Sequence, residues 1–327
     1  MEFIRGLHNL KPRHRGCVAT IGNFDGVHLG HQAVIGQLAE RAQELKLPTL
    51  VLLFEPQPQE FFRPEAAPPR LTRLREKIVA LRRYSVDRVL CVRFNARFAA
   101  LAAEDFIRRV LVEGLGVRYL VVGDDFRFGH DRRGDFAMLA EAGRRHGFQV
   151  VNMHPVNMDG ARVSSTRIRA ALAQADLATA EKLLGRPYRM CGRVAHGDKR
   201  GRTLGVPTAN IYLHRKTTPL TGVFVVEMFG LAREPLPGVA NIGTRPTVGG
   251  TRTLLEAHLL DFADDIYGAY VHVNFLHKLR AEMRFASLDE LKARIAQDVA
   301  EARAFFAQYH TNYSTQRRKD AEGAKGF

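Results

Sequence analysis

Apolar runs and amphipathic stretches alternate through the first half of the chain. Five short runs are apolar throughout, as buried strands are, and they span residues 17–22, 49–54, 88–94, 118–123 and 148–153. Between them, apolar residues with helical spacing occupy 29–46, 71–84, 103–114 and about 133–146, while a Pro-rich loop fills 55–70. Strands that are apolar on both faces and alternate with helices predict a doubly wound parallel sheet covered on both sides.

The second half follows a different pattern. After two short helices, expected at 165–173 and 176–184, the residues GRP at 185–187 interrupt the regular spacing. Five β-rich runs follow, at 188–196, 222–230, 236–243, 251–262 and 269–280. No segment between them is long enough for a crossover helix, so we expect an antiparallel barrel or sandwich.

An amphipathic helix at 287–308 is expected to close this half, with Ser287 as its N-cap and Glu290 completing a capping box. The change of pattern predicts two domains, at 1–185 and 186–310, followed by a polar and frayed tail at 311–327.

Composition places the chain among ordinary globular proteins. Apolar residues make up 46% of the sequence, yet no apolar run approaches the ~18 residues of a membrane helix. The segment 1–16 carries charges where a signal peptide needs an unbroken apolar stretch. Cys17, Cys91 and Cys191 lie far apart without a CxxC pair, so neither a disulfide framework nor a zinc site is expected. We therefore expect a soluble, cytoplasmic protein, and the sequence makes no prediction of its oligomeric state.

The net charge is +15, from 49 Lys and Arg against 34 Asp and Glu, and the excess is spread over both halves. Such a surface suits nucleic acid or a small substrate rich in phosphate. The even spread of charge and the absence of Trp count against a nucleic-acid partner, and we expect none. A basic nucleic-acid-binding protein with an accessory β-barrel nevertheless stays open as an alternative.

The segment GNFDGVHLGH, residues 22–31, stands where a predicted strand turns into a predicted helix. Gly22 and Gly30 let a ligand approach the backbone, and the helix N-terminus offers free N–H groups to a phosphate. His28 and His31 are three residues apart, so their rings project toward the same point. The pair could hold a triphosphate as charge develops on its α-phosphorus. Alternatively, the two histidines are only polar helix-start residues or metal ligands.

A second phosphate-binding candidate is VSSTRIR, residues 163–169. Ser164, Ser165 and Thr166 supply hydroxyls at a helix start, and Arg169 follows within one turn, so all can face phosphate oxygens. The alternative is an ordinary Ser/Thr N-cap on a basic helix. The patterns GxGxxG, GxxxxGK[ST] and HExxH are absent, which argues against standard dinucleotide, P-loop and zinc-protease sites.

The β-rich half contains a third candidate, HGDKRGRTLGVPTAN at 196–210. Gly201 and Arg202 belong to a cationic, glycine-rich loop suited to phosphates. Thr208 and Asn210 supply hard oxygen ligands, which suit Mg²⁺ held partly by nucleotide phosphates. The alternative is a glycine-rich turn before a strand.

Glu256 lies within an otherwise apolar predicted strand. Strand alternation leaves two directions for its carboxylate, toward solvent or into a site.

These segments occur in an order that resembles a known family. HxGH followed by SSTRIR resembles the nucleotidyltransferases that transfer AMP to a phosphorylated acceptor. More narrowly, residues 1–310 resemble the bacterial bifunctional riboflavin kinase/FMN adenylyltransferases, also called FAD synthetases. The resemblance rests on GNFDGVHLGH, LFEPQPQEFF, LTRLREK, VVGDDFRFGH, SSTRIR, GRTLGVPTAN, NIGTRPTV and LLEAHLLDF, in family order.

The resemblance implies a fold and two reactions. It implies an N-terminal parallel sheet of the HxGH nucleotidyltransferase type and a C-terminal barrel of the flavokinase type. It also implies that riboflavin is phosphorylated with ATP to give FMN, which a second ATP converts to FAD and pyrophosphate. Mg²⁺ is the implied cofactor, and ATP, riboflavin and FMN are the implied substrates. A second alternative, a single activity toward another phosphorylated acceptor, is disfavoured by the flavin-pocket segments.

Residue roles also follow from the resemblance. It implies that His28 and His31 act in adenylyl transfer, and that Glu256 is the base facing the ribityl 5′-hydroxyl. The implied nucleotide- or phosphate-binding residues are Gly22, Phe24, Asp25, Gly30, Ser164, Ser165, Thr166, Arg169, Gly201 and Arg202. The implied flavin-binding residues are Pro56, Pro58, Phe62, Gly123, Asp125, Phe128 and Arg245. The implied metal ligands are Thr208 and Asn210; for Phe62 and Phe128 the alternative is core packing.

Overall fold

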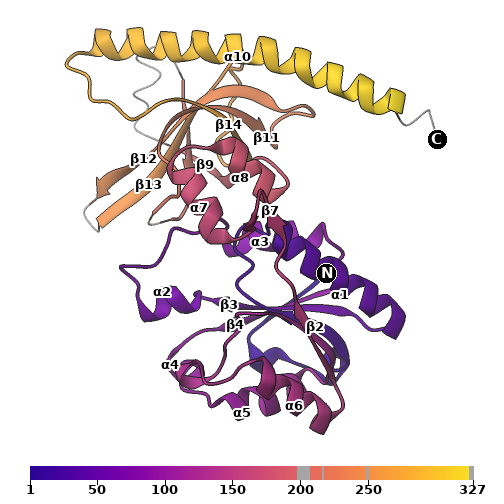
Figure 1. The fold of residues 1–327 in the computed structure, drawn as a ribbon. Helices are drawn as coiled ribbons and strands as arrows, with labels where there is room; N and C mark the ends of the chain where they lie inside the picture. Colours follow the sequence, from indigo (N-terminus) through magenta and orange to yellow (C-terminus); the bar gives the residue numbers. More distant parts are fainter. Residues whose placement is uncertain (197–206, 216, 248–249, 324–327) are drawn as a thin grey trace. The chain divides into compact units, whose positions relative to one another are not determined.

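The computed structural model describes residues 1–196, 207–215, 217–247 and 250–323, with only the backbone described at 244–247, 250–252 and 310–323 (Figure 1). The chain divides into two compact units. The first contains Met1–Ile168 and Leu183–Gly185, and the second contains Arg169–Lys182 and the chain from Arg186 onward. The division of the chain into 1–185, 186–310 and 311–327 stays a prediction.

Six parallel strands form the sheet of the first unit, in the order β1-β4-β3-β2-β5-β6. They are β1 (Glu2–Arg5), β2 (Cys17–Ile21), β3 (Thr49–Glu55), β4 (Arg88–Arg93), β5 (Val117–Gly123) and β6 (Gln149–Met153). The predicted parallel sheet is therefore confirmed, with β1 as an additional edge strand. The strand order reverses around β2, which lies between β3 and β5, and ligands of such sheets bind at the carboxyl ends of the strands around this point.

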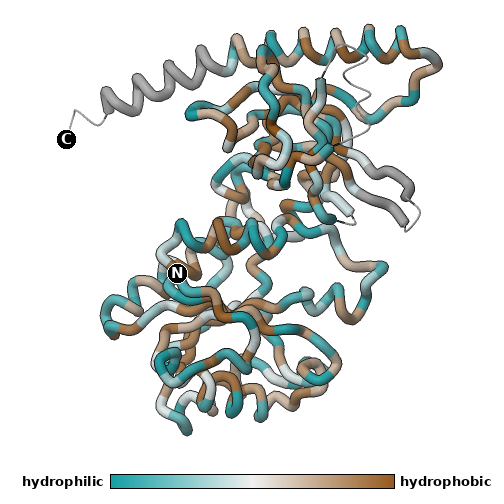
Figure 2. Tube along the Cα trace, turned by 180° about the vertical axis from the view of Figure 1, so that it is seen from behind, coloured by the Kyte–Doolittle hydropathy of each residue, from teal (hydrophilic) through white to brown (hydrophobic). Residues whose placement is uncertain are grey.

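Helices cover both faces of this sheet (Figure 1). They are α1 (Leu29–Leu45), α2 (Pro58–Phe62), α3 (Leu74–Arg82), α4 (Ala96–Ala99), α5 (Ala103–Phe106) with its π-helical continuation η3 (Ile107–Gly114), and α6 (Phe136–His146). Short 3₁₀ turns are η1 (Leu7–Asn9), η2 (Pro12–His14) and η4 (His130–Arg132). Along β2, Ala19 packs with η3 and α6, whereas its neighbour Val18 packs with α1, as strand alternation requires. Figure 2 shows the resulting hydrophobic segments gathered along the strands.

A short hairpin and two helices follow the sheet. The hairpin strands are β7 (Asn157–Met158) and β8 (Ala161–Arg162), and the helices are α7 (Ser165–Ala173) and α8 (Leu177–Leu184). The two helices predicted at 165–173 and 176–184 are confirmed, whereas the hairpin was not predicted. α7 starts in the first unit and ends among residues of the second.

The second unit is a closed barrel of antiparallel strands, in the order β10-β13-β12-β11-β14-β9. The strands are β9 (Arg189–Ala195), β10 (Ala209–Tyr212), β11 (Gly222–Phe229), β12 (Leu236–Thr247), β13 (Gly250–Leu259) and β14 (Tyr270–Arg280). The large buried rings of Phe224 and Phe275 pack edge to face with centroids 5.4 Å apart. Of the two predicted architectures, the barrel is confirmed, and β10 is a strand that the sequence pattern missed.

Helix α10 (Leu288–Gly323) packs on the outside of the barrel, where Ala302 and Phe306 cover Val223 and Val225. Ser287 caps it as predicted, since its Oγ accepts a hydrogen bond from Glu290 N at 3.1 Å. The Glu290 carboxylate accepts from Ala286 N rather than from the capping residue. The helix continues to Gly323, beyond the end predicted near 308, and the frayed tail stays a prediction.

Among the described residues, no helix has both the length and the apolar character required to cross a membrane.

Candidate active sites

The HxGH segment forms a strained turn between β2 and α1. Phe24, Gly26 and Val27 have φ values of 47°, 86° and 43°, in the left-handed region that a β-branched residue rarely adopts. The side chains of Phe24 and Val27 are 2% and 0% exposed and pack in the same core cluster as Ile35 of α1. Because the core fixes both side chains, the turn keeps a strained backbone that would otherwise relax.

The two histidines of this turn stack on each other. Their ring centroids are 3.7 Å apart with an angle of 19° between planes, and the Phe24 ring lies 4.7 Å from His31. His28 is the N-cap of α1, and its Nδ1 accepts a hydrogen bond from His31 N at 3.4 Å. Burial, followed by the charges of His28, Lys77 and Arg162, holds the pKa of His31 well below its usual 6.5. His31 is therefore neutral at pH 7, and the convergence expected from the spacing is present.

Asp25 anchors the turn to the segment that precedes α3. Its carboxylate accepts hydrogen bonds from Leu71 N at 3.0 Å, Thr72 N at 2.8 Å and Thr72 Oγ1 at 3.1 Å, and Gly26 N donates to the same hydroxyl at 2.8 Å. Asp25 is 2% exposed, so these contacts lie inside the fold. The helix predicted over 71–84 begins at Leu74, because Arg73 is its N-cap and donates its backbone N–H to the Glu76 carboxylate at 2.7 Å.

The SSTR segment meets the HxGH turn. Ser165 Oγ donates to the main-chain oxygen of Asp25 at 2.9 Å, across 140 residues of sequence. A Cβ on Gly30 would lie 3.2 Å from the His28 ring and 3.4 Å from the Val163 oxygen, so only glycine lets the two segments come this close without a shift. The two predicted phosphate-binding segments thus form one surface at the switch point of the sheet.

The other predicted phosphate-binding residues of the segment 163–169 do not contact the HxGH turn as Ser165 does. Ser164 Oγ accepts from Arg167 N at 3.2 Å, which is an N-cap contact, and Thr166 is exposed. Arg167 donates to the main chain of the β7–β8 hairpin. Arg169 lies one turn along α7 from Ser165, among the residues grouped with the second unit.

Aromatic rings line the carboxyl ends of β3 and β4. Phe62, at the end of α2, is 61% exposed, and its ring lies 5.6 Å from Phe94, which also contacts Phe61 at 5.5 Å. Pro56 precedes this helix and Pro58 is its first residue. The sequence patterns missed Phe61 and Phe94, although Phe61 lies in the loop after one predicted strand and Phe94 ends another, which was a usable signal.

Arg70 ties the α2 loop to the sheet. Its guanidinium donates to both Glu55 oxygens, at 3.0 and 2.6 Å, and also pairs with Glu60. Although burial opposes it, the hydrogen bonds from Arg70 hold the pKa of Glu60 below its usual value. This partly buried network fixes the loop that carries Pro56, Pro58 and Phe62.

The three predicted flavin-binding residues that follow or end β5 differ in their burial and contacts. Phe128 is 7% exposed and packs against Phe106 and Phe126, as the core-packing alternative expected. Gly123 ends β5, and Asp125 is an ion-pair partner of Arg162, whose Nη2 lies 3.3 Å from Asp125 Oδ1. Arg162, which no sequence pattern predicted as a site residue, also pairs with Asp124 at 3.2 Å.

Glu256 lies on the outer face of the barrel between two amides. In the strand register it stands opposite Asn210 of β10 on one side and Asn241 of β12 on the other. Its neighbours Leu255 and Ala257 are 0% and 1% exposed and point into the barrel, so Glu256 points outward. All three polar residues of this row are half-buried, and Asn241 Oδ1 is buried without a hydrogen-bond partner among the described residues.

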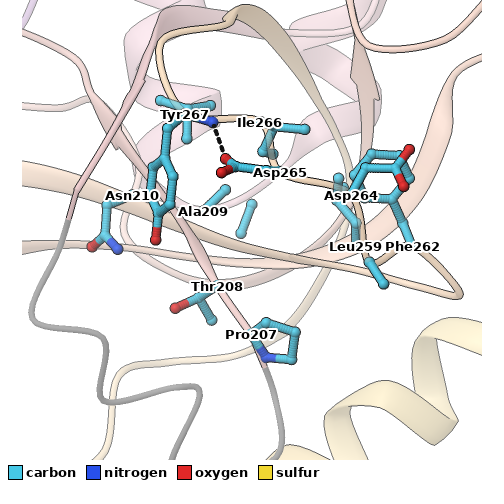
Figure 3. Close-up of a pocket in the computed structure, with 13 residues that line it drawn as sticks. Pro207, Thr208, Ala209, Asn210, Leu259, Phe262, Asp264, Asp265, Ile266 and Tyr267 are labelled. Atoms are coloured by element: carbon cyan, nitrogen blue, oxygen red, sulfur yellow. Dashed lines mark hydrogen bonds between the residues drawn. The ribbon is translucent and has the colours of Figure 1, made fainter.

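A pocket adjoins this row, with Thr208 and Asn210 among its lining residues (Figure 3). It has a volume of about 90 Å³. Its other lining residues are the apolar Val194, Pro207, Ala209, Ala257, Leu259, Phe262, Ala263 and Ile266, together with Asp264, Asp265 and Tyr267. Asp265 accepts a hydrogen bond from Tyr267 N at 3.0 Å, which fixes the loop after β13.

Three predicted binding residues cannot be placed in this geometry. Gly201 and Arg202 lie outside the described residues, and only the backbone of Arg245 is described, within β12. In the described part of the chain, no group of three or more His, Cys, Asp and Glu side chains could hold a metal ion.

The chain is similar to proteins of known families over both units. The family model described as FAD synthetase matches residues 10–167, and the model described as riboflavin kinase matches residues 184–306. The bifunctional riboflavin kinase/FMN adenylyltransferase of Pseudomonas fluorescens is 57% identical over 308 residues, which cover 94% of this chain and 98% of the relative. The relative of that name from Escherichia coli K12 is 56% identical over 307 residues, with the same coverage. A solved Streptococcus pneumoniae structure, described as a macrolide-efflux protein, is 30% identical with a TM-score of 0.78, over 93% of this chain and 99% of its own.

Proposed function

The chain belongs to the bifunctional riboflavin kinase/FMN adenylyltransferase family, and we propose that its two reactions occur at the two sites described above. It is an ATP-dependent transferase that makes FMN from riboflavin and FAD from FMN. We assign adenylyl transfer to the HxGH turn and riboflavin phosphorylation to the outer face of the barrel. The contact of Ser165 with Asp25 supports this assignment most directly, because it joins two distant phosphate-binding segments.

Adenylyl transfer needs no protein nucleophile. An FMN phosphate oxygen attacks the α-phosphorus of ATP, the bond from that phosphorus to the bridging oxygen breaks, and pyrophosphate leaves. The stacked His28 and His31 rings and the N-terminus of α1 can donate hydrogen bonds to the phosphate oxygens. Gly22, Phe24 and Gly30 shape the turn so that the phosphates approach its backbone. Catalysis at this site is then a matter of positioning and charge stabilisation.

The exposed aromatic surface suits the flavin ring. An isoalloxazine is flat and largely apolar, so it gains most from stacking on rings such as Phe62 and on proline surfaces such as Pro56 and Pro58. Gly123 and Asp125 lie after β5, at the neighbouring position along the same edge of the sheet. Phe128 supports this edge from within the core.

At the barrel, Glu256 is proposed as the base. The ribityl 5′-oxygen attacks the γ-phosphorus of ATP, ADP leaves, and Glu256 accepts the hydroxyl proton. Asn210 and Asn241 stand on either side and can orient the hydroxyl. The oxygens of Thr208 and Asn210 are hard donors next to a carboxylate, a set that fits Mg²⁺ shared with nucleotide phosphates. The ion would supply positive charge to those phosphates.

The pocket beside this row suits the nucleoside end of ATP. Its apolar walls can enclose an adenine, while Asp264 and Asp265 can accept hydrogen bonds from amino or hydroxyl groups. The same carboxylates repel phosphates, so the triphosphate is expected on the side of Thr208 and Asn210. The three cysteines are free and buried, which supports a reducing, cytoplasmic location. We expect small-molecule substrates and no nucleic-acid partner.

Product analysis of the full chain tests the assignment. Incubation with riboflavin, ATP and Mg²⁺, followed by chromatography, should yield FMN and FAD. His31→Ala should accumulate FMN, with FAD formation lower by about two to three orders of magnitude. His146→Ala, which removes an exposed imidazole from α6, is the matched control and should behave like the unaltered chain. Equal loss of both products in His31→Ala would contradict two separate sites.

A further inference from the structure

Arg70 binds a carboxylate at each end of the α2 loop, which we define as residues 55–62. Glu55 is the last residue of β3, and Glu60 lies within α2. The guanidinium donates to Glu55 at 3.0 and 2.6 Å, and its Nε donates to Glu60 at 2.5 Å. The three side chains are 18, 32 and 24% exposed, so salt screens these ion pairs less than pairs in open solvent.

This arrangement uses the shape of a guanidinium. Nη1 and Nη2 of Arg70 bind the two oxygens of Glu55, while Nε and Nη2 bind the two oxygens of Glu60. A lysine has a single ammonium group and cannot make two such bidentate contacts. Glu60 also accepts a hydrogen bond from Gln57 N, the N-cap of α2, at 2.9 Å. Arg70 therefore joins the end of β3 to the first turn of α2.

The two residues after Arg70 hold the HxGH turn. Leu71 N and Thr72 N donate to the Asp25 carboxylate at 3.0 and 2.8 Å. Two residues of chain span at most about 7 Å, so the anchor of the α2 loop and the anchor of the turn are close together. An FMN phosphate oxygen must reach the α-phosphorus of ATP, which requires a fixed separation between the flavin and the nucleotide. Residues 70–72 are placed to set that separation.

We propose that Arg70 is a positioning residue for FMN, which holds the α2 loop in a fixed place relative to the HxGH turn. The inference rests on the assignment of the flavin ring to this loop. Arg70 acts through Glu55 and Glu60, and the ring that it positions is the 61% exposed Phe62. Without these pairs, FMN would have to order the loop as it binds. Its apparent affinity would then fall with the fraction of time that the loop spends in place.

Replacement of Arg70 in the full chain should weaken the binding of FMN and leave that of ATP unchanged. Arg70→Met removes both carboxylate contacts, and we expect KM for FMN in adenylylation to rise about 10-fold or more. Arg70→Lys keeps the charge but not the fork, so we expect a smaller rise, about 3-fold. KM for ATP should stay within about 2-fold in both variants, because the backbone of Leu71 and Thr72 still binds Asp25.

Arg108→Met is the matched control. Arg108 of η3 also pairs with two carboxylates, Asp105 and Glu113, and its side chain is 49% exposed. This variant should keep both KM values of the unaltered chain. Riboflavin phosphorylation and the thermal midpoint are measured for every variant, and phosphorylation should continue in all of them. If Arg70→Met does not fold, Arg70→Lys decides by the same comparison of the two KM values.

An unchanged KM for FMN in the Arg70 variants would overturn the proposal. An equal rise in KM for FMN and for ATP would also overturn it, because it would indicate a general structural role. Phe62→Ala is measured alongside. A raised KM for FMN in Phe62→Ala with unchanged values in the Arg70 variants refutes the role of Arg70 alone, whereas an unchanged KM in Phe62→Ala refutes the assignment of the flavin ring to this loop.

Discussion

Replacing Asp25 by Asn tests how the HxGH turn is held. The carboxylate accepts two backbone N–H bonds and one hydroxyl bond while it is 2% exposed. Asparagine has the same shape, but one of its two end groups is an NH₂ donor. Whichever way the amide is turned, that donor faces an N–H group of Leu71 or Thr72, so one bond is lost and its partner stays buried.

The expected cost follows from these contacts. A hydrogen bond to a charged group contributes about 1.5–3 kcal/mol and a neutral one about 1 kcal/mol, so the two retained bonds together weaken by at least about 1 kcal/mol. The buried N–H group left without an acceptor adds about 1–3 kcal/mol. We therefore expect Asp25→Asn to lower the free energy of unfolding of the first unit by about 3 kcal/mol. A domain with an ordinary stability of about 5–15 kcal/mol survives this loss.

Urea unfolding followed by circular dichroism measures the loss, and hydrogen exchange of the Leu71 and Thr72 amides reports the turn itself. The matched control is Asp135→Asn at the N-cap of α6, where the side chain accepts from Met138 N and Asn caps as well as Asp. FAD formation should fall in Asp25→Asn while riboflavin phosphorylation continues. A loss of stability below about 1 kcal/mol, equal to that of the control, would refute the proposed anchoring.

Four further predictions concern both units. Glu256→Gln should lower the rate of riboflavin phosphorylation by about two to four orders of magnitude, with little change in riboflavin and ATP affinity and continued FAD formation from supplied FMN; a defect confined to riboflavin binding would show that Glu256 only positions the substrate. A fragment of residues 186–327 should phosphorylate riboflavin without making FAD, as product chromatography can check, and an inert fragment would contradict an independent barrel. Burial raises the pKa of Cys17 to about 12, so a thiol reagent at about pH 8 should label it only after denaturation; labelling of the folded chain would contradict this. Because the folded-state pKa of His31 lies well below 6.5, FMN adenylylation should keep its rate as pH falls through about 6.5, and a half-maximal rate near that pH would be contrary to the expectation.

The sequence pattern predicted the strands of five or more residues and missed the shorter ones. Five strands of the parallel sheet have five to seven residues and were recognised, whereas β1 has four, buries only Ile4 and carries charges at both ends. β10 has four residues and alternates buried with half-buried positions, too short for a period of two to stand out. Length thus decided which strands could be found.

Local spacing placed the two histidines correctly because both lie on one helical turn. It could not show that the Asp25 carboxylate binds residues 71 and 72, because no spacing rule links positions 46 residues apart. Nor could it choose the direction of Glu256, for which alternation left two answers. The burial of Leu255 and Ala257 inside the barrel settled that direction, and this burial depends on the closure of the whole barrel.

The closed barrel restricts where residues can be inserted into, or deleted from, the second unit. β13 pairs with β12 at ten positions and with β10 at four, so it is held along both sides and has no free edge along which to slide. One residue inserted or deleted within β13 before Glu256 would turn the strand over, placing the carboxylate among the barrel's core side chains and Leu255 or Ala257 on the surface. Insertions that preserve phosphorylation must therefore fall in the turns between strands, where length can vary without inverting a face.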